Sequence, residues 1–99
     1  MAKLRAFELP GYDAWFNSAD HLPPHFHVEK PGEWEIKVVF RKDRSEMFET
    51  VWPKNPKRKG AKPKPAELAH IAEKVEAHRA ELLEQWEQVV NVTAPGPQR

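Results

Sequence analysis

The middle of this 99-residue chain reads Glu33-Trp34-Glu35-Ile36-Lys37-Val38-Val39-Phe40-Arg41. Large apolar side chains alternate here with charged ones, and a period of two residues places the two kinds on opposite faces of an extended strand. The side chains expected on the apolar face are Trp34, Ile36, Val38 and Phe40. The alternation therefore predicts a strand with one face in a hydrophobic core and the other in water.

Shorter segments on both sides of this strand show similar patterns. Residues 5–9, 12–16 and 25–30 precede it, and residues 46–52 follow it. Turn signals separate them at Pro10-Gly11, at Pro31-Gly32 and in the polar stretch 42–45. Because tight turns join antiparallel neighbours, we expect a small antiparallel sheet of three to four strands within residues 5–52.

A different period marks the C-terminal part of the chain. After a basic linker at residues 53–64, apolar side chains recur every three or four residues. This spacing predicts one long amphipathic helix over residues 66–90, with Pro65 in its first turn, packed across the sheet. We therefore expect a single α+β domain over residues 1–92 and a disordered tail at residues 93–99.

The composition is typical of a soluble globular domain. Hydrophobic residues make up 39% and charged residues 31% of the chain. No apolar run approaches the roughly 20 residues that cross a bilayer, and no secretory signal follows the basic first residues. Cysteine is absent, which excludes disulfides and thiolate ligands. We expect a cytoplasmic protein without a membrane partner, in which any metal would bind histidine nitrogens and carboxylate oxygens.

Charge is strongly segregated, although the formal net charge is only +1. The segment 54–64 contains no acidic residue and six basic ones: Lys54, Lys57, Arg58, Lys59, Lys62 and Lys64. Such a segment can contact a nucleic-acid backbone, and it can equally be a solvated loop. The sequence leaves both interpretations open.

Chemically reactive side chains are densest in the run Asp20-His21-Leu22-Pro23-Pro24-His25-Phe26-His27-Val28-Glu29. Three of the five histidines occur here, and histidine is both the side chain that titrates near neutral pH and the commonest metal ligand. His25 and His27 are two residues apart on a predicted strand, so they share a face. The two prolines stiffen the loop that holds Asp20 and His21.

Three interpretations of this segment compete. In the first, His25 and His27 bind a divalent metal together with Asp20 or Glu29, although the spacing matches no strong metal motif. In the second, two histidines act as general acid and general base on a phosphodiester, and basic residues hold the phosphate. In the third, the histidines are structural and satisfy backbone groups around the proline turn.

A further histidine, His78, falls on the apolar stripe of the expected helix. A histidine there can be a packed core side chain, and it can also complete a catalytic pair with a histidine of the sheet. If the apolar face of the histidine strand packs on the helix, however, His25 and His27 point away from His78. A meeting then requires the sheet edge or a helix that covers the histidine face.

Two stretches of the chain carry a family resemblance. One comprises Trp15-Phe16-Asn17, Asp20-His21 and Pro23-Pro24-His25-Phe26-His27-Val28-Glu29; the other is His78-Arg79-Ala80-Glu81-Leu82-Leu83, with Trp86 beyond it. They resemble the signature of a small prokaryotic family known as domain of unknown function 4160. This resemblance implies a compact α+β domain and a role as the toxin half of a toxin–antitoxin pair, with a small antitoxin protein as partner.

These features together suggest a toxin-like protein that acts on RNA by histidine acid–base cleavage, a ribonuclease without a certain cofactor. The catalytic candidates are His21, His25, His27, His78 and Asp20; His25 and His27 would transfer protons and Asp20 would orient an imidazole. The candidates for contact with RNA phosphate are Lys54, Lys57, Arg58, Lys59 and Lys62. The alternatives are a non-enzymatic protein-binding module and a domain that binds a divalent metal through His25, His27 and Asp20. The oligomeric state stays open.

Overall fold

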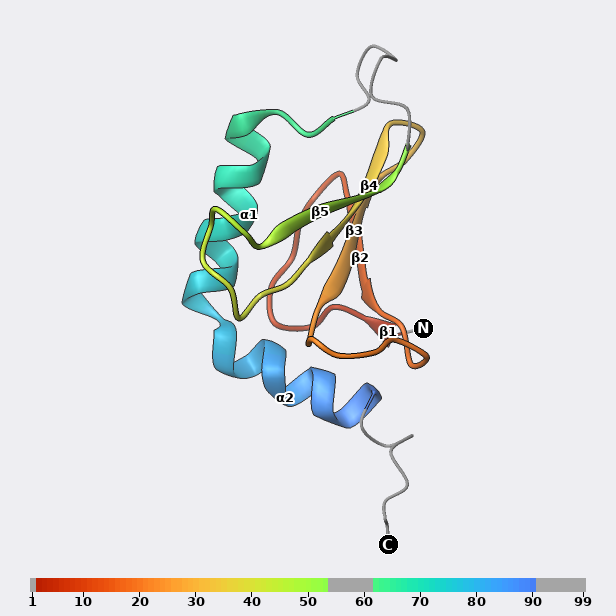
Figure 1. Cartoon of the computed structure of the whole chain (residues 1–99), viewed down its shortest axis with the longest axis vertical. Coiled ribbons are helices and arrows are strands. Elements are labelled where there is room, and N and C mark those ends of the chain that lie inside the picture. The colour runs from red at the N-terminus through yellow and green to blue at the C-terminus, as the bar shows by residue number, and fades with distance from the viewer. Residues whose placement is uncertain (1, 54–61, 91–99) are drawn as a thin grey trace, which may run out of the picture.

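The hairpin of β3 (Phe26–Lys30) and β4 (Trp34–Val38) lies at the centre of the sheet in the computed structural model, which describes residues 2–53 and 62–90 (Figure 1). Lys30 pairs with Trp34, and Phe26 pairs with Val38, in antiparallel register. The connecting turn places Gly32 at φ +78°, a left-handed conformation that favours glycine. The turn expected at Pro31-Gly32 is therefore confirmed.

Three further strands extend this hairpin. β2 (Asp13–Phe16) pairs with β3, the two-residue β1 (Ala2–Lys3) pairs with β2, and β5 (Phe48–Trp52) pairs with β4. The strand order is β1-β2-β3-β4-β5, and every neighbouring pair is antiparallel. The α+β class is confirmed, but the expected three to four strands are too few, since the sheet has five. β1 is too short to show any alternation in the sequence.

Residues 5–9, expected as the first strand, form no strand. The Arg5 N–H donates to Oε1 of Gln85 (2.9 Å), and the Gln85 amide donates to the Lys3 carbonyl (2.8 Å). The buried Gln85 side chain thus takes up backbone groups that a longer β1 would pair with a neighbouring strand. Phe7 and Leu9 still enter the core, but they do so from an irregular segment.

The C-terminal part forms two helices, α1 (Pro65–Ala77) and α2 (Arg79–Val89), so the expected single helix over residues 66–90 is wrong. The break is at His78, whose φ of −132° and ψ of 23° are not helical. The His78 N–H donates to the Val75 carbonyl (3.0 Å), and Leu82 donates to the His78 carbonyl (3.0 Å). In Figure 1 the break turns α2 across the lower end of the sheet. The apolar periodicity continues through the break, which is why the sequence did not show it.

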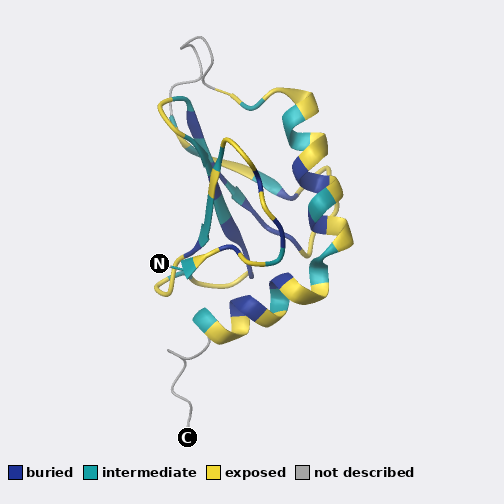
Figure 2. Ribbon diagram, turned by 180° about the vertical axis from the view of Figure 1, so that it is seen from behind, coloured by how far each residue is buried: buried dark blue, intermediate teal, exposed yellow. Residues whose placement is uncertain are grey.

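One face of the sheet packs against both helices to form the core, and the buried positions of the helices face the sheet in Figure 2. The main core side chains are Phe16, Phe26, Val28, Ile36, Val38, Ile71, Val75, Leu82 and Trp86. On the opposite face, the middle strands present half-buried polar side chains, among them His27, Glu29, Glu35 and Lys37. Neither α1 nor α2 has the length and apolarity needed to span a membrane.

Hydrogen bonds of the Glu67 carboxylate connect the start of α1 to the sheet. Glu67, in the first turn, accepts hydrogen bonds from the Lys64 N–H (2.8 Å), from the Tyr12 hydroxyl and from Lys30 Nζ (3.2 Å). Burial raises the pKa of Glu67, but these hydrogen bonds outweigh burial and hold its pKa below the ordinary value. The ionised carboxylate therefore stabilises the folded state.

We predict that Glu67→Gln lowers the free energy of unfolding by about 1–2 kcal/mol at pH 7, the usual cost of losing a cap and a charged hydrogen bond. Because the folded-state pKa is depressed, this stabilisation is complete above the unfolded pKa and disappears as the pH falls through the folded value. Urea unfolding at neutral and acid pH measures it, with the exposed Glu87→Gln as control. A Glu67→Gln deficit that does not shrink in acid would contradict this account.

Candidate metal centre

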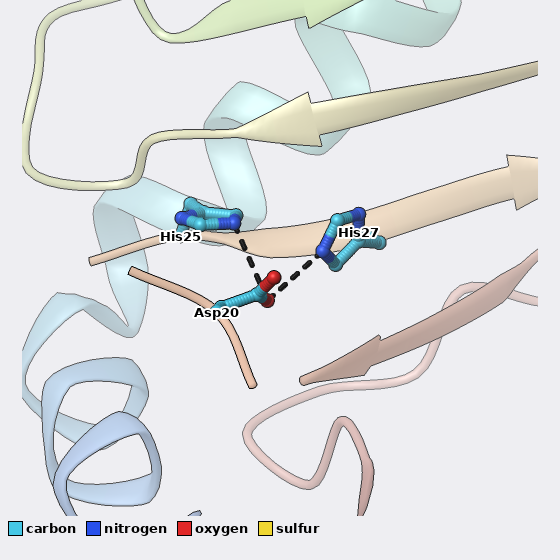
Figure 3. Close-up of side chains that lie close together, drawn as sticks. All are labelled: Asp20, His25 and His27. Carbon is cyan, nitrogen blue, oxygen red and sulfur yellow. Dashed lines mark hydrogen bonds and ion pairs between the residues drawn. The ribbon is translucent and has the colours of Figure 1, made fainter. Parts of the chain in front are cut away.

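The side chains of Asp20, His25 and His27 converge beside the start of β3 (Figure 3). Oδ2 of Asp20 lies 2.9 Å from Nε2 of His27 and 3.3 Å from Nε2 of His25. One potential ligand atom from each residue lies within 4.8 Å of the other two. Three of the residues chosen from the sequence thus form one group, which we call the His-Asp-His group.

These side chains come from a strand and from the loop that precedes it. His27 belongs to β3 and points to the polar face, where it lies opposite Trp15 and Lys37 on the neighbouring strands. Asp20 ends a turn in which its N–H donates to the Asn17 carbonyl (3.0 Å). The intervening loop contains a cis peptide bond between Leu22 and Pro23, whereas the bond between the two prolines is trans.

Each of the four imidazole nitrogens faces an oxygen atom. Nδ1 of His25 lies 2.8 Å from the Pro23 carbonyl oxygen, and both Nε2 atoms face Asp20. Nδ1 of His27 lies 3.3 Å from Oε2 of Glu35, yet this buried nitrogen has no well-formed hydrogen bond among the described residues. Two neutral imidazoles carry two protons between them, so only two of their four nitrogens can donate to the three facing oxygens. Two nitrogen lone pairs therefore face oxygen lone pairs.

The position of the His25 proton follows from its neighbours. The Pro23 carbonyl can only accept, so Nδ1 of His25 carries a proton and donates to it. Burial lowers the pKa of His25, and this effect outweighs the opposing influence of the Pro23 hydrogen bond and of Asp20. The neutral ring then presents an unprotonated Nε2 to the centre of the group, as a metal-ligating histidine does.

Aromatic rings hold both imidazoles in place. The Trp15 indole stacks on His27 with ring centroids 5.4 Å apart and planes 12° apart. The Trp86 indole of α2 lies 5.6 Å from the His25 ring, centroid to centroid. The group is enclosed on these sides but not sealed, because the side chains of His25, His27 and Asp20 are 6%, 13% and 14% exposed.

Other expected site residues lie elsewhere. His78 is not part of the group: its ring lies 5.5 Å from the Phe7 ring, and its Nδ1 is 2.8 Å from Oε1 of Glu81. His78 lies at the helix break and contacts Phe7, whereas Trp86 of α2 contacts His25. His21 is exposed in the loop, and Glu29, the alternative metal ligand, also lies outside the group.

The expected phosphate contacts are mostly outside the described residues. This holds for Lys54, Lys57, Arg58 and Lys59, and also for the tail at residues 93–99. Lys62 is described and exposed, and no ion pair or hydrogen bond of its side chain is found within the described part of the chain.

Two residues of the site were missed by the sequence reasoning. Glu35 approaches Nδ1 of His27, and Trp15 covers the face of its ring. Both follow from strand register, since Trp15 lies directly opposite His27 and Glu35 is diagonal to it across β4. A register assigned from the Pro31-Gly32 turn would have identified Glu35.

The fold and the His-Asp-His group define a small α+β domain with two histidines and a carboxylate at one end of a five-stranded sheet. The chain belongs to the family described as Domain of unknown function (DUF4160), whose family model matches residues 11–87. This membership confirms the expected family, and the matched region includes the whole group. No curated protein and no solved structure matches the chain.

We predict that neutral His25 is the Nδ1-protonated tautomer in metal-free protein, because Nδ1 lies 2.8 Å from the Pro23 carbonyl oxygen, whereas Nε2 lies 3.3 Å from an Asp20 oxygen that is closer to His27. Long-range ¹H–¹⁵N NMR at pH 7.5 distinguishes the two ring nitrogens directly. The exposed His70 is the internal reference and should show the ordinary mixture dominated by the Nε2-protonated form. Finding the His25 proton on Nε2 would refute the proposed arrangement of the group.

Proposed function

We propose that this chain is a metal-binding domain in which Asp20, His25 and His27 hold a divalent first-row transition metal ion. The observation that supports this most strongly is the convergence of two histidine Nε2 atoms on one carboxylate oxygen, at 3.3 Å and 2.9 Å. Imidazole and carboxylate together are a ligand set used for zinc, iron and nickel in proteins.

Protons on the two imidazoles cannot give every polar atom of the group a hydrogen bond while both rings are neutral. Donation from all four ring nitrogens would require both imidazoles to be cations in a mostly buried place, with ring centroids 5.2 Å apart. Burial lowers the pKa of His25 and opposes this state. A divalent cation supplies the same charge at one point and leaves both rings neutral, so each Nδ1–H can donate to its own acceptor.

The surroundings also support a metal. Metal-bound histidines usually donate their second ring N–H to a carbonyl or carboxylate, which fixes the tautomer and the ring direction. The Pro23 carbonyl has this position for His25, and Glu35 has it for His27. Three protein ligands leave coordination positions open, and a bound metal ion would there lower the pKa of a water molecule and support hydrolysis.

A second candidate is the toxin-like role on RNA, in which His25 and His27 transfer protons without a metal. It is supported by the same two Nε2 atoms on one carboxylate, since an acid and a base must reach a common point. The metal has more support than this candidate because both Nε2 atoms face one carboxylate oxygen and protons on two neutral rings leave two ring nitrogens facing oxygens without a hydrogen bond.

We predict that protein freed of metal by dialysis binds one Zn²⁺ or Co²⁺ per chain in calorimetric titration. Asp20→Asn retains the side-chain shape but removes the anionic ligand, so it should weaken binding more than about 100-fold, and Glu35→Gln about 10- to 100-fold. His70→Ala, on the exposed side of α1, is the matched control and should bind as the wild type does. Equal affinities for all these chains would eliminate the proposed centre.

A separate prediction concerns hydrolysis. Mixed cellular RNA incubated with the metal-loaded protein should be cleaved, and EDTA or the His25→Ala, His27→Ala double variant should abolish cleavage. Cleavage that persists in EDTA but is lost in the double variant would favour the acid–base candidate over the metal. No cleavage under any condition, with intact metal binding, would favour a non-catalytic binding module.

A further inference from the structure

A second feature lies beside the His-Asp-His group on the polar face of the sheet. It is an open cavity of about 710 Å³, lined by Lys3, Tyr12, Asp13, Ala14, Trp15, Glu29 and Glu35. Cavities of this size are in the range that accommodates small ligands or a large side chain. We call it the acidic cavity, because three carboxylates and one ammonium group line it.

The carboxylates of this cavity form a row across three strands. Asp13 of β2 lies directly opposite Glu29 of β3, and Glu29 lies directly opposite Glu35 of β4. Like charges at such positions destabilise a sheet. Within the described part of the chain, no ion pair joins Asp13 or Glu29 to a basic side chain. The ion pair of Glu35 found there is with His27.

The next row of the same face is built differently. It runs Lys3, Trp15, His27, Lys37 and Glu49 across five strands, and Lys37 and Glu49 form an ion pair (3.4 Å). From this row Lys3 supplies one ammonium group to the cavity against three carboxylates, which leaves an excess of negative charge in the lining. An excess of this kind is explained if a cation from outside the chain completes it.

An aromatic side chain indicates which kind of cation the cavity favours. Trp15 lines the cavity and is held in place by its stacking on His27, whereas the Tyr12 ring lies against buried Trp34 and its hydroxyl donates to Glu67. An indole ring attracts cations, and a planar, weakly hydrated guanidinium gains more from this ring than a strongly hydrated metal ion does. A guanidinium also presents a fork of N–H donors that two neighbouring carboxylates can accept.

We propose that the acidic cavity binds a guanidinium group between the Trp15 ring and the carboxylates of Asp13 and Glu29. The cation comes from a free arginine-like molecule or from an arginine side chain of a polypeptide. This site is distinct from the His-Asp-His group and does not require a metal there. Glu35 contributes to both, so the test leaves Glu35 unchanged.

The test titrates metal-free protein in EDTA with N-acetyl-arginine amide and follows the indole N–H resonance of Trp15 by NMR. Saturable binding is expected, at least about tenfold tighter than binding of the isosteric, uncharged citrulline derivative. The Asp13→Asn, Glu29→Gln double variant should lose a similar factor, whereas Glu49→Gln, on the same face but outside the cavity, should bind normally.

Equal responses to the arginine and citrulline derivatives, or normal binding by the double variant, would overturn the proposal. An N-acetyl-lysine amide that binds as tightly as the arginine derivative would overturn the choice of guanidinium. An arginine-centred tripeptide separates the two sources: tighter binding than the amino-acid derivative supports a polypeptide, and equal binding supports a small molecule. Failure here leaves the metal titrations unaffected, because the two tests substitute different side chains and the metal titrations contain no guanidinium compound.

Discussion

The antiparallel pairing of β3 with β4 is the constraint on which the rest of this structure depends. It pairs Val28 with Ile36 on the face that the helices cover, and His27 with Lys37 on the face that they do not. A shift of one residue would exchange the two faces and place charged side chains in the core. The hydrophobic effect therefore fixes the register, and the register in turn determines which polar side chains meet on the outer face.

The His-Asp-His group occupies the boundary between these two environments. His27 belongs to the polar face, but His25 precedes the strand and lies against Trp86 of the core-forming helix. The group is therefore buried enough to lower the pKa of His25, and its side chains are still exposed enough to be reached from solvent. Polar atoms in such a place destabilise a small domain unless they are satisfied, which is the physical reason to expect a function for them.

The helical break at His78 has an indirect effect on the site. Because of the break, α1 and α2 pack against different parts of the sheet. Trp86 of α2 then contacts His25, and the Gln85 side chain donates a hydrogen bond to the backbone of β1. Glu67 fastens the other end of this helical layer to Tyr12 and Lys30. Loop, sheet and helix thus meet around one group, although its ligand atoms come from only eight consecutive residues, 20–27.

The sequence by itself determined the α+β class, the central strands, the turn at Gly32 and the group of Asp20, His25 and His27, because period, turn residues and closeness along the chain are local properties. It did not reveal β1, the break between the helices, the remote position of His78 or the contribution of Glu35. Each of these depends on contacts between segments far apart in the sequence: Gln85 with the Lys3 carbonyl, His78 with Phe7, and Glu35 with His27. Only the tertiary structure decided them, because the free energy of such contacts depends on packing and register.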